Sequence, residues 1–177
     1  LEYLREAQSI TEEAMEFACR TICKATPDVE GVLHDGDTVL TSELMRQRIT
    51  SFLIAKNCSN HNDSIVVTVP HVADCHHHGS GPLRTGLPVI VDIFPRMNAT
   101  GYWGDCTRTA VNGDPSSQIL KMHEAVVKAK EDYCLRHEIP FPHFNRLAGR
   151  PIKPSPLYDT LKAKGAVFEE VYGFERP

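Results

Sequence analysis

The sequence contains no long hydrophobic segment. Its longest apolar run extends from Pro88 to Phe94 and already contains Asp92, whereas a helix that crosses a bilayer needs about 20 apolar residues. No signal peptide is visible at the start, and both ends of the sequence, at Leu1 and Pro177, have the character of cut ends. We therefore expect no membrane span, and a fragment of a longer reading frame.

An excess of basic residues is also absent. The 177 residues include 19 Lys and Arg against 23 Asp and Glu, which gives a formal net charge of −4, and no block of like charges occurs. Proteins that bind a phosphate backbone usually show the opposite balance, concentrated in one patch. The sequence therefore predicts no nucleic-acid partner.

The six cysteines form no Cys-x-x-Cys pair. A chain of this length can bury about 70% of its surface, so it does not need disulfides to stabilise a core. We expect reduced thiols and a cytoplasmic location.

Apolar residues recur every three or four positions in three segments, which is the period of an α-helix. These helices are expected over residues 1–25, from a cap at Thr41 to about Asn57, and from a cap at Asp114 to about His137. Short β-branched runs predict strands over 64–69, 89–94 and 101–111, the last two as a β-hairpin. With a short helix at 157–164 and a strand at 166–172, the expected class is α+β.

Proline marks a change of composition after the third helix. Five of the twelve prolines lie between residues 140 and 156, which is typical of an irregular linker. We expect three parts: a main domain over 1–138, a linker over 139–154 and a short segment over 155–177.

Asp92 interrupts an apolar strand, where a carboxylate needs a partner to offset the cost of burial. Asp105 lies on the strand expected to face it, so the hairpin would bring the two carboxylates together. Two such charges are tolerated side by side when divalent cations lie between them. The structural alternative is that the aspartates accept bonds from backbone amides or pair with Arg96 or Arg108, which are near in sequence.

These residues lie in strings with a specific resemblance. Asp92-Ile93-Phe94-Pro95-Arg96 and the run from Gly101 to Thr109 resemble the signature of the pita-bread metallopeptidases, which include methionine aminopeptidases, Xaa-Pro aminopeptidases, prolidases and creatinase. The likeness extends back through Gly79–Leu83, Leu40–Glu43 and Leu4–Ala7. It covers about residues 1–138 and implies an incomplete pita-bread domain, a β-hairpin sheet flanked by helices.

The resemblance implies a hydrolase that removes an N-terminal residue preceding proline. Asp92 and Asp105 match two ligands of a dinuclear site that holds Mn, Co or Zn, and the bridging water attacks the peptide carbonyl. Thr107 matches a hydroxyl that bonds the bridging water or a ligand carboxylate. The implied partner is a peptide with proline at its second position.

Three adjacent histidines follow Cys75. Three neighbouring side chains cannot all converge on one ion, and no zinc-ligand spacing is present. By resemblance, His76 contacts the substrate near the scissile bond, whereas His77 and His78 fall on polar, exposed positions. The alternative for all three is a solvated loop.

The remaining family ligands, a His and two Glu, are not found. His123, His137 and His143 lack the expected Gly-His-Gly context, and Glu124 and Glu131 recur on what should be the polar face of the third helix. We therefore expect little or no peptidase activity from this chain alone, because two carboxylates should hold a metal weakly.

The last segment has a separate resemblance. Ser155–Asp159, Gly165–Glu169 and Gly173–Pro177 resemble part of the dimethylglycine and sarcosine dehydrogenase family. No Gly-x-Gly-x-x-Gly loop is present to hold FAD. The join is either a gene fusion or an artefact of assembly.

Three other interpretations stay open. The chain could be a non-catalytic peptide-binding relic, a fragment of a demethylating flavoenzyme, or a domain in which both aspartates are structural. An incomplete sheet should also leave an edge and apolar surface uncovered, so a homo-oligomer is possible.

Overall fold

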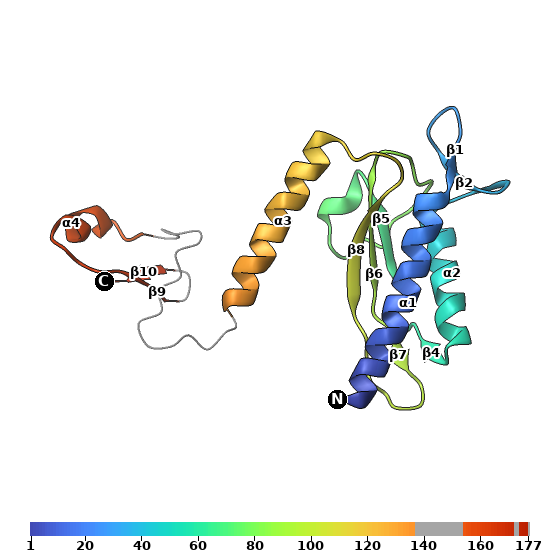
Figure 1. The fold of residues 1–177 in the computed structure, drawn as a ribbon, viewed down its shortest axis with the longest axis horizontal. Coiled ribbons are helices and arrows are strands. Elements are labelled where there is room, and N and C mark those ends of the chain that lie inside the picture. Colours follow the sequence, from blue (N-terminus) through green and yellow to red (C-terminus); the bar gives the residue numbers. More distant parts are fainter. Residues whose placement is uncertain (137–153, 172–173, 177) are drawn as a thin grey trace. The chain divides into compact units, whose positions relative to one another are not determined.

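The computed structural model describes residues 1–136, 154–171 and 174–176, and Figure 1 shows their fold. The chain divides into two compact units, Leu1–Ile119 and Leu120–Pro177. The expected linker over 139–154, together with His137, Glu138 and His143, lies largely outside the described residues.

Two helices and a three-stranded antiparallel sheet form the body of the first unit. The helices are α1 (Glu2–Lys24) and α2 (Ser42–Ala55), and the strands are β5 (Ile65–Thr68), β6 (Pro88–Ile93) and β8 (Cys106–Val111), in the order β5-β6-β8. Helix α1 packs against β6 and β8, and α2 packs against α1 and β5 (Figure 1). The core lies between these helices and one face of the sheet.

Each of these two helices buries one apolar face in the core, and α2 also begins at a capping side chain. The Thr41 side chain accepts a bond from the Leu44 amide (3.1 Å) and so begins α2. The core-facing residues of α1 and α2 are fully buried, among them Ala14, Ala18, Ile22, Met45, Ile49 and Leu53. At the C-terminal end of α1, the buried Asn112 side chain donates to the last carbonyls of the helix.

Shorter elements complete the first unit. They are a sheet of β1 (Thr26–Pro27), β2 (Leu33–Asp35) and β3 (Thr38–Val39), a pair of β4 (Cys58–Ser59) with β7 (Arg96–Met97), and a 3₁₀ turn, η1 (His71–Ala73).

The hairpin expected from residues 89–111 differs from the observed connection. After β6 the chain leaves the sheet, and β7 pairs with β4 instead. Gly101 takes a positive φ of 76°, and β8 begins only at Cys106. The strand expected to start at residue 101 is therefore five residues shorter at its N-terminal end.

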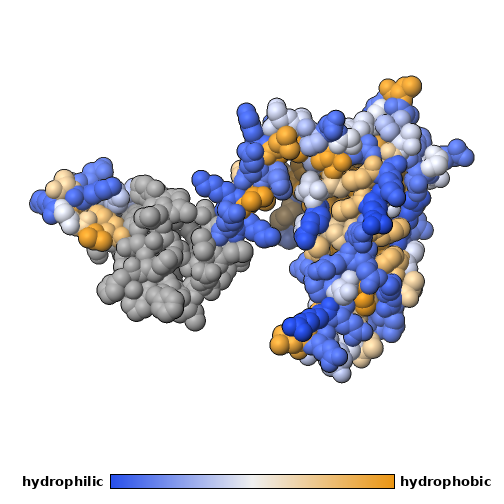
Figure 2. Space-filling view, in the orientation of Figure 1, coloured by the Kyte–Doolittle hydropathy of each residue, from blue (hydrophilic) through white to orange (hydrophobic). Residues whose placement is uncertain are grey.

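The second unit contains most of α3 (Ser117–Arg136), with α4 (Tyr158–Ala163) and a hairpin of β9 (Glu169–Val171) and β10 (Phe174–Arg176). The Tyr158 ring lies against the buried Phe168, with centroids 4.4 Å apart. On α3 the side chains of Leu120, Met122 and Val126 are exposed, and Figure 2 shows hydrophobic atoms among hydrophilic ones on this helix. The sequence predicts apolar residues at the helix period here, and two of them, Met122 and Val126, are exposed in the structure.

Candidate functional site

Asp92 lies on the face of the sheet that is turned away from the helices. Successive side chains of a strand point to opposite faces, and β6 follows this rule: Val91 and Ile93 are fully buried, whereas Asp92 is half-buried. The expectation of a carboxylate buried inside an apolar strand is therefore wrong. The pleat places this carboxylate on the open face.

Thr107, not Asp105, lies directly opposite Asp92 in the ladder. The Thr107 hydroxyl donates to Asp92 Oδ1 at 2.5 Å. Asp105 directly precedes β8 and lies two residues before Thr107, so we infer from the strand alternation that it extends toward the same face as Asp92. The effect of the Asp92 charge on the pKa of Asp105 agrees with this placement. The structure thus brings together the three residues that the sequence singles out on this hairpin.

The two aspartates interact through their charges. Partial burial raises the pKa of Asp105 above its usual range, and the negative charge of Asp92 raises it further. Neither neighbouring arginine relieves this repulsion: Arg96 donates to the Gly101 carbonyl (3.3 Å) and Arg108 to the Thr107 carbonyl (2.8 Å). Among the described residues, neither aspartate has an ion-pair partner, so the alternative of an Arg pairing is not supported.

Helix α1 holds the segment that carries Asp105. The Asp105 amide donates to the Gln8 side chain (3.2 Å), and the Gly104 amide donates to the Pro95 carbonyl (3.1 Å). A Cβ on Gly104 would lie 2.0 Å from Thr11 Oγ1, so only glycine allows this approach. The start of β8 is therefore fixed against the helix.

The donor set fits part of a metal site. Carboxylate oxygens suit hard divalent cations, and a positive ion between Asp92 and Asp105 would remove their repulsion. However, nowhere in the described part of the chain do three or more His, Cys, Asp or Glu side chains gather in a way that could hold a metal. The two aspartates and Thr107 thus provide one side of a coordination shell, and no reaction step follows from them alone.

The histidine loop holds its three side chains apart. His76 is exposed, and its amide donates to Asp74 Oδ1 (3.0 Å). The His77 ring stacks on the His71 ring at 4.2 Å between centroids, and its Nδ1 accepts a bond from the Gly79 amide (2.9 Å). His77 is therefore half-buried and structural rather than solvated, whereas His78 is exposed as expected. No bond among the described residues joins His76 to the aspartate pair.

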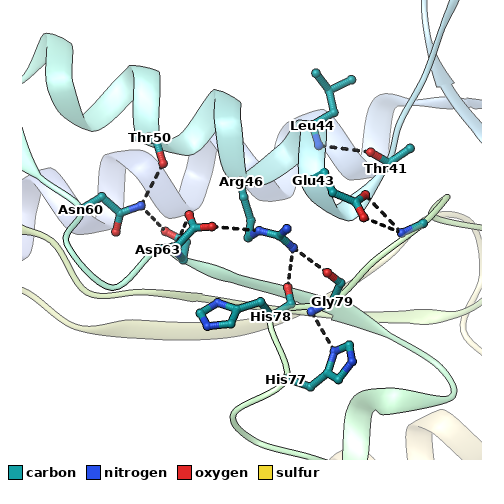
Figure 3. A network of polar contacts seen from close by, with 12 residues as sticks. Thr41, Glu43, Leu44, Arg46, Thr50, Asn60, Asp63, His77, His78 and Gly79 are labelled. Atoms are coloured by element: carbon teal, nitrogen blue, oxygen red, sulfur yellow. Dashed lines mark hydrogen bonds and ion pairs between the residues drawn. The ribbon is translucent and has the colours of Figure 1, made fainter.

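Helix α2 holds this loop by two side chains (Figure 3). Both carboxylate oxygens of Glu43 accept the Gly81 amide at 3.1 Å. Hydrogen bonds from its own backbone amide and from Gly81 lower the pKa of Glu43. Arg46 donates to the carbonyls of His78 and Gly79, at 2.7 Å each. The motif strings Leu40–Glu43 and Gly79–Leu83 are thus neighbours in space.

Sequence reasoning missed Arg46. Its partners lie 17 to 33 residues away along the chain, and no local pattern marks such a contact. For Glu43 a signal exists, because it follows the helix cap at Thr41 within a string that carries the resemblance.

The chain resembles known metallopeptidases in sequence and in fold. The model of metallopeptidase family M24 matches residues 2–146. The chain is similar to a prolidase from Pyrococcus furiosus, at 18% identity and a TM-score of 0.57, over 73% of this chain and 34% of that one. It is also similar to an X-Pro aminopeptidase from Thermotoga maritima MSB8, at 18% identity and a TM-score of 0.55, over 73% and 33% of the two chains. The chain spans about a third of these structures, and the likeness confirms the partial pita-bread fold.

A second match has a different character. The chain is 40% identical to the human protein described as "Sarcosine dehydrogenase, mitochondrial" over 50 residues. These 50 residues are 28% of this chain and 5% of that protein. Both resemblances expected from the sequence are thus found, and the second match, at 50 residues, is longer than the expected segment 155–177. None of the helices in the described ranges is long and apolar enough to span a bilayer.

Proposed function

This chain belongs to metallopeptidase family M24, and we propose that it retains the N-terminal half of a peptide-processing site. Members of the family act on peptides and generally use divalent metals. The observation that carries the proposal is the pair Asp92 and Asp105, which share the open face of the sheet, repel one another and have no cationic partner among the described residues.

In this proposal the two aspartates hold one divalent ion, of the Mn, Co or Zn class. Thr107 orients the Asp92 carboxylate through its hydrogen bond, and His76 contacts the peptide. The preferred substrate would carry proline at its second position, in line with the likeness to an X-Pro aminopeptidase. When bound, the metal would polarise the scissile carbonyl and activate water.

We expect weak binding and no measurable hydrolysis by this chain alone. Two carboxylates supply at most half of the oxygen ligands that such a cation needs, and no described side chain is placed as a general base near them. Turnover of an Xaa-Pro peptide that disappears in Asp92→Asn would contradict this expectation.

Calorimetric titration of the metal-free chain with Mn(II) tests the proposal. Binding should occur in the parent and disappear in Asp92→Asn and in Asp105→Asn. The matched control is Asp37→Asn, which removes an equal charge from the exposed turn between β2 and β3. Absence of binding in the parent, or equal binding in all four proteins, would refute a metal site at the hairpin.

A second candidate is a peptide-binding domain without catalysis. The observation that favours it is the loop 76–81, which the side chains of Glu43 and Arg46 hold through hydrogen bonds to its backbone. The test is binding of the tripeptide Ala-Pro-Ala in excess chelator. Binding that persists there supports this candidate, whereas binding that requires Mn(II) supports the metal site.

The remaining proposals concern other parts of the chain. We propose a metallopeptidase-like part over 1–138, a linker over 139–154 and a segment from a demethylating flavoprotein over 155–177. A purified protein without a flavin spectrum and without folate binding would exclude flavoenzyme activity. The free thiols of the described cysteines suit the cytoplasm, and the exposed apolar side chains of α3 favour self-association.

A further inference from the structure

Arg46 is a mostly buried cation that bonds two backbone carbonyls and one carboxylate. Its side chain is 14% exposed. Its Nη1 lies 2.7 Å from the carbonyl oxygens of both His78 and Gly79, and its Nε lies 3.1 Å from Asp63 Oδ2 (Figure 3). One guanidinium therefore joins α2 to two successive carbonyls of the histidine loop.

Two successive carbonyls that converge on one atom need a positive group between them. Their partial negative charges repel, and a charge-assisted bond to each is stronger than a neutral one. The Gly79 backbone is packed closely against Val66, because a Cβ on Gly79 would lie 1.8 Å from the Val66 carbonyl oxygen, and Gly79 has a φ of +84°. We therefore expect the loop to keep this path only while the guanidinium is present.

The loop is fixed on the other sides as well. The Val66 amide donates to the His78 carbonyl (3.2 Å), so β5 and α2 share that oxygen. The Gly79 amide donates to His77, and Glu43 accepts the Gly81 amide. Arg46 thus acts at the centre of the segment that follows His76.

We propose that Arg46 is a positioning residue for peptide binding: it holds residues 76–81 in the conformation that presents His76 to the peptide. The proposal rests on the peptide-binding role of this loop stated above. Arginine is required rather than any cation, because its planar fork bonds two carbonyls and a carboxylate at once, whereas the compact ammonium of lysine cannot span these three groups.

The experiment uses the full chain and three variants, Arg46→Met, Arg46→Lys and Arg48→Met. Arg48 is the matched control: it lies on the same helix but pairs with Asp35, away from the loop. Each protein is titrated with Ala-Pro-Ala at a temperature where all are folded, and amide hydrogen exchange is measured at residues 76–81.

In both Arg46 variants we expect peptide binding about tenfold weaker or more, which is the loss of about 1.4 kcal/mol, and exchange at 76–81 faster by a similar factor. Compared with Arg46→Met, Arg46→Lys should recover thermal stability but not peptide affinity. If Arg46 only stabilised the fold, stability and affinity would recover together. Arg48→Met should match the parent in affinity and in loop exchange.

The two readouts separate this inference from the proposed function. If the parent binds no peptide but Arg46→Met still frees the loop, the peptide-binding role fails and the positioning of the loop stands. If Arg46→Lys binds as tightly as the parent, or if the loop exchanges at the parent rate in both Arg46 variants, the positioning role is refuted.

Discussion

The Asn112→Asp substitution replaces a side-chain NH2 group, which lies against the C-terminus of α1, by a carboxylate oxygen, with little change in side-chain volume. Asn112 is 5% exposed. Its Nδ2 donates to the carbonyls of Ile22 (2.9 Å), Cys23 (3.2 Å) and Ala25 (2.9 Å), at the end of the helix where carbonyls lose their intrahelical partners. The Ile22 carbonyl also accepts the Ala25 amide, at 3.4 Å. An aspartate would instead place an acceptor and a negative charge against three carbonyl oxygens at the negative end of the helix dipole.

The expected loss in the free energy of unfolding is about 3 kcal/mol at pH 7. About two hydrogen bonds worth roughly 1 kcal/mol each disappear, and the buried carbonyls left without a donor add a further cost of about 1 kcal/mol or more. With an m-value of about 2 kcal/mol/M, the urea midpoint should fall by about 1.5 M.

The assay is urea unfolding followed by the fluorescence of Trp103. This is the one tryptophan of the chain and it belongs to the first unit, so its signal reports the unit that contains α1. Asn98→Asp is the control, because Asn98 is exposed and makes one side-chain bond, to Asn57 (3.2 Å). It should cost less than about 0.5 kcal/mol.

The pH dependence gives a further check on Asn112→Asp. The carbonyl oxygens disfavour the charged form, so the pKa of the new carboxyl is raised in the folded protein. Its protonated form can donate one bond, and stability is lost as pH rises through the folded pKa. The deficit relative to the parent should shrink toward low pH. A loss below about 1 kcal/mol at pH 7, or a deficit that grows on acidification, would refute the reasoning.

Two other predictions concern the hairpin. In Gly104→Ala the new Cβ would lie 2.0 Å from Thr11 Oγ1 and 2.6 Å from the Ala7 carbonyl, so we expect a loss of about 3 kcal/mol in the same urea assay; Thr11→Ala in addition should recover only part of it, and a melting curve equal to the parent's would contradict the contact. The pKa of Asp105 is raised by burial and by Asp92, so its contribution to stability falls as pH rises through the folded pKa. Asp105→Asn should therefore stabilise by a few tenths of a kcal/mol at neutral pH and by less at low pH, and a gain that increases on acidification would show the wrong sign.

The fold was predictable where the determining contacts are local. The period of the apolar residues defines α1 and α2, because a helix face repeats within four residues, and the Thr41 cap acts within three. The late start of β8 was not predictable. It depends on the approach of Gly104 to Ala7 and Thr11 of α1, which lie more than 90 residues earlier in the chain.

The candidate site divides in the same way. The family strings, the acid pair Asp92 and Asp105, and Thr107 beside them could be read from the sequence alone, because these residue types and spacings occur in one short segment. Long-range packing is needed to show that Asp92 points away from the core, and that Arg46 rather than another residue holds the histidine loop. A one-residue change of register would move a strand side chain to the other face, and the contacts of Arg46 join segments that no local pattern connects.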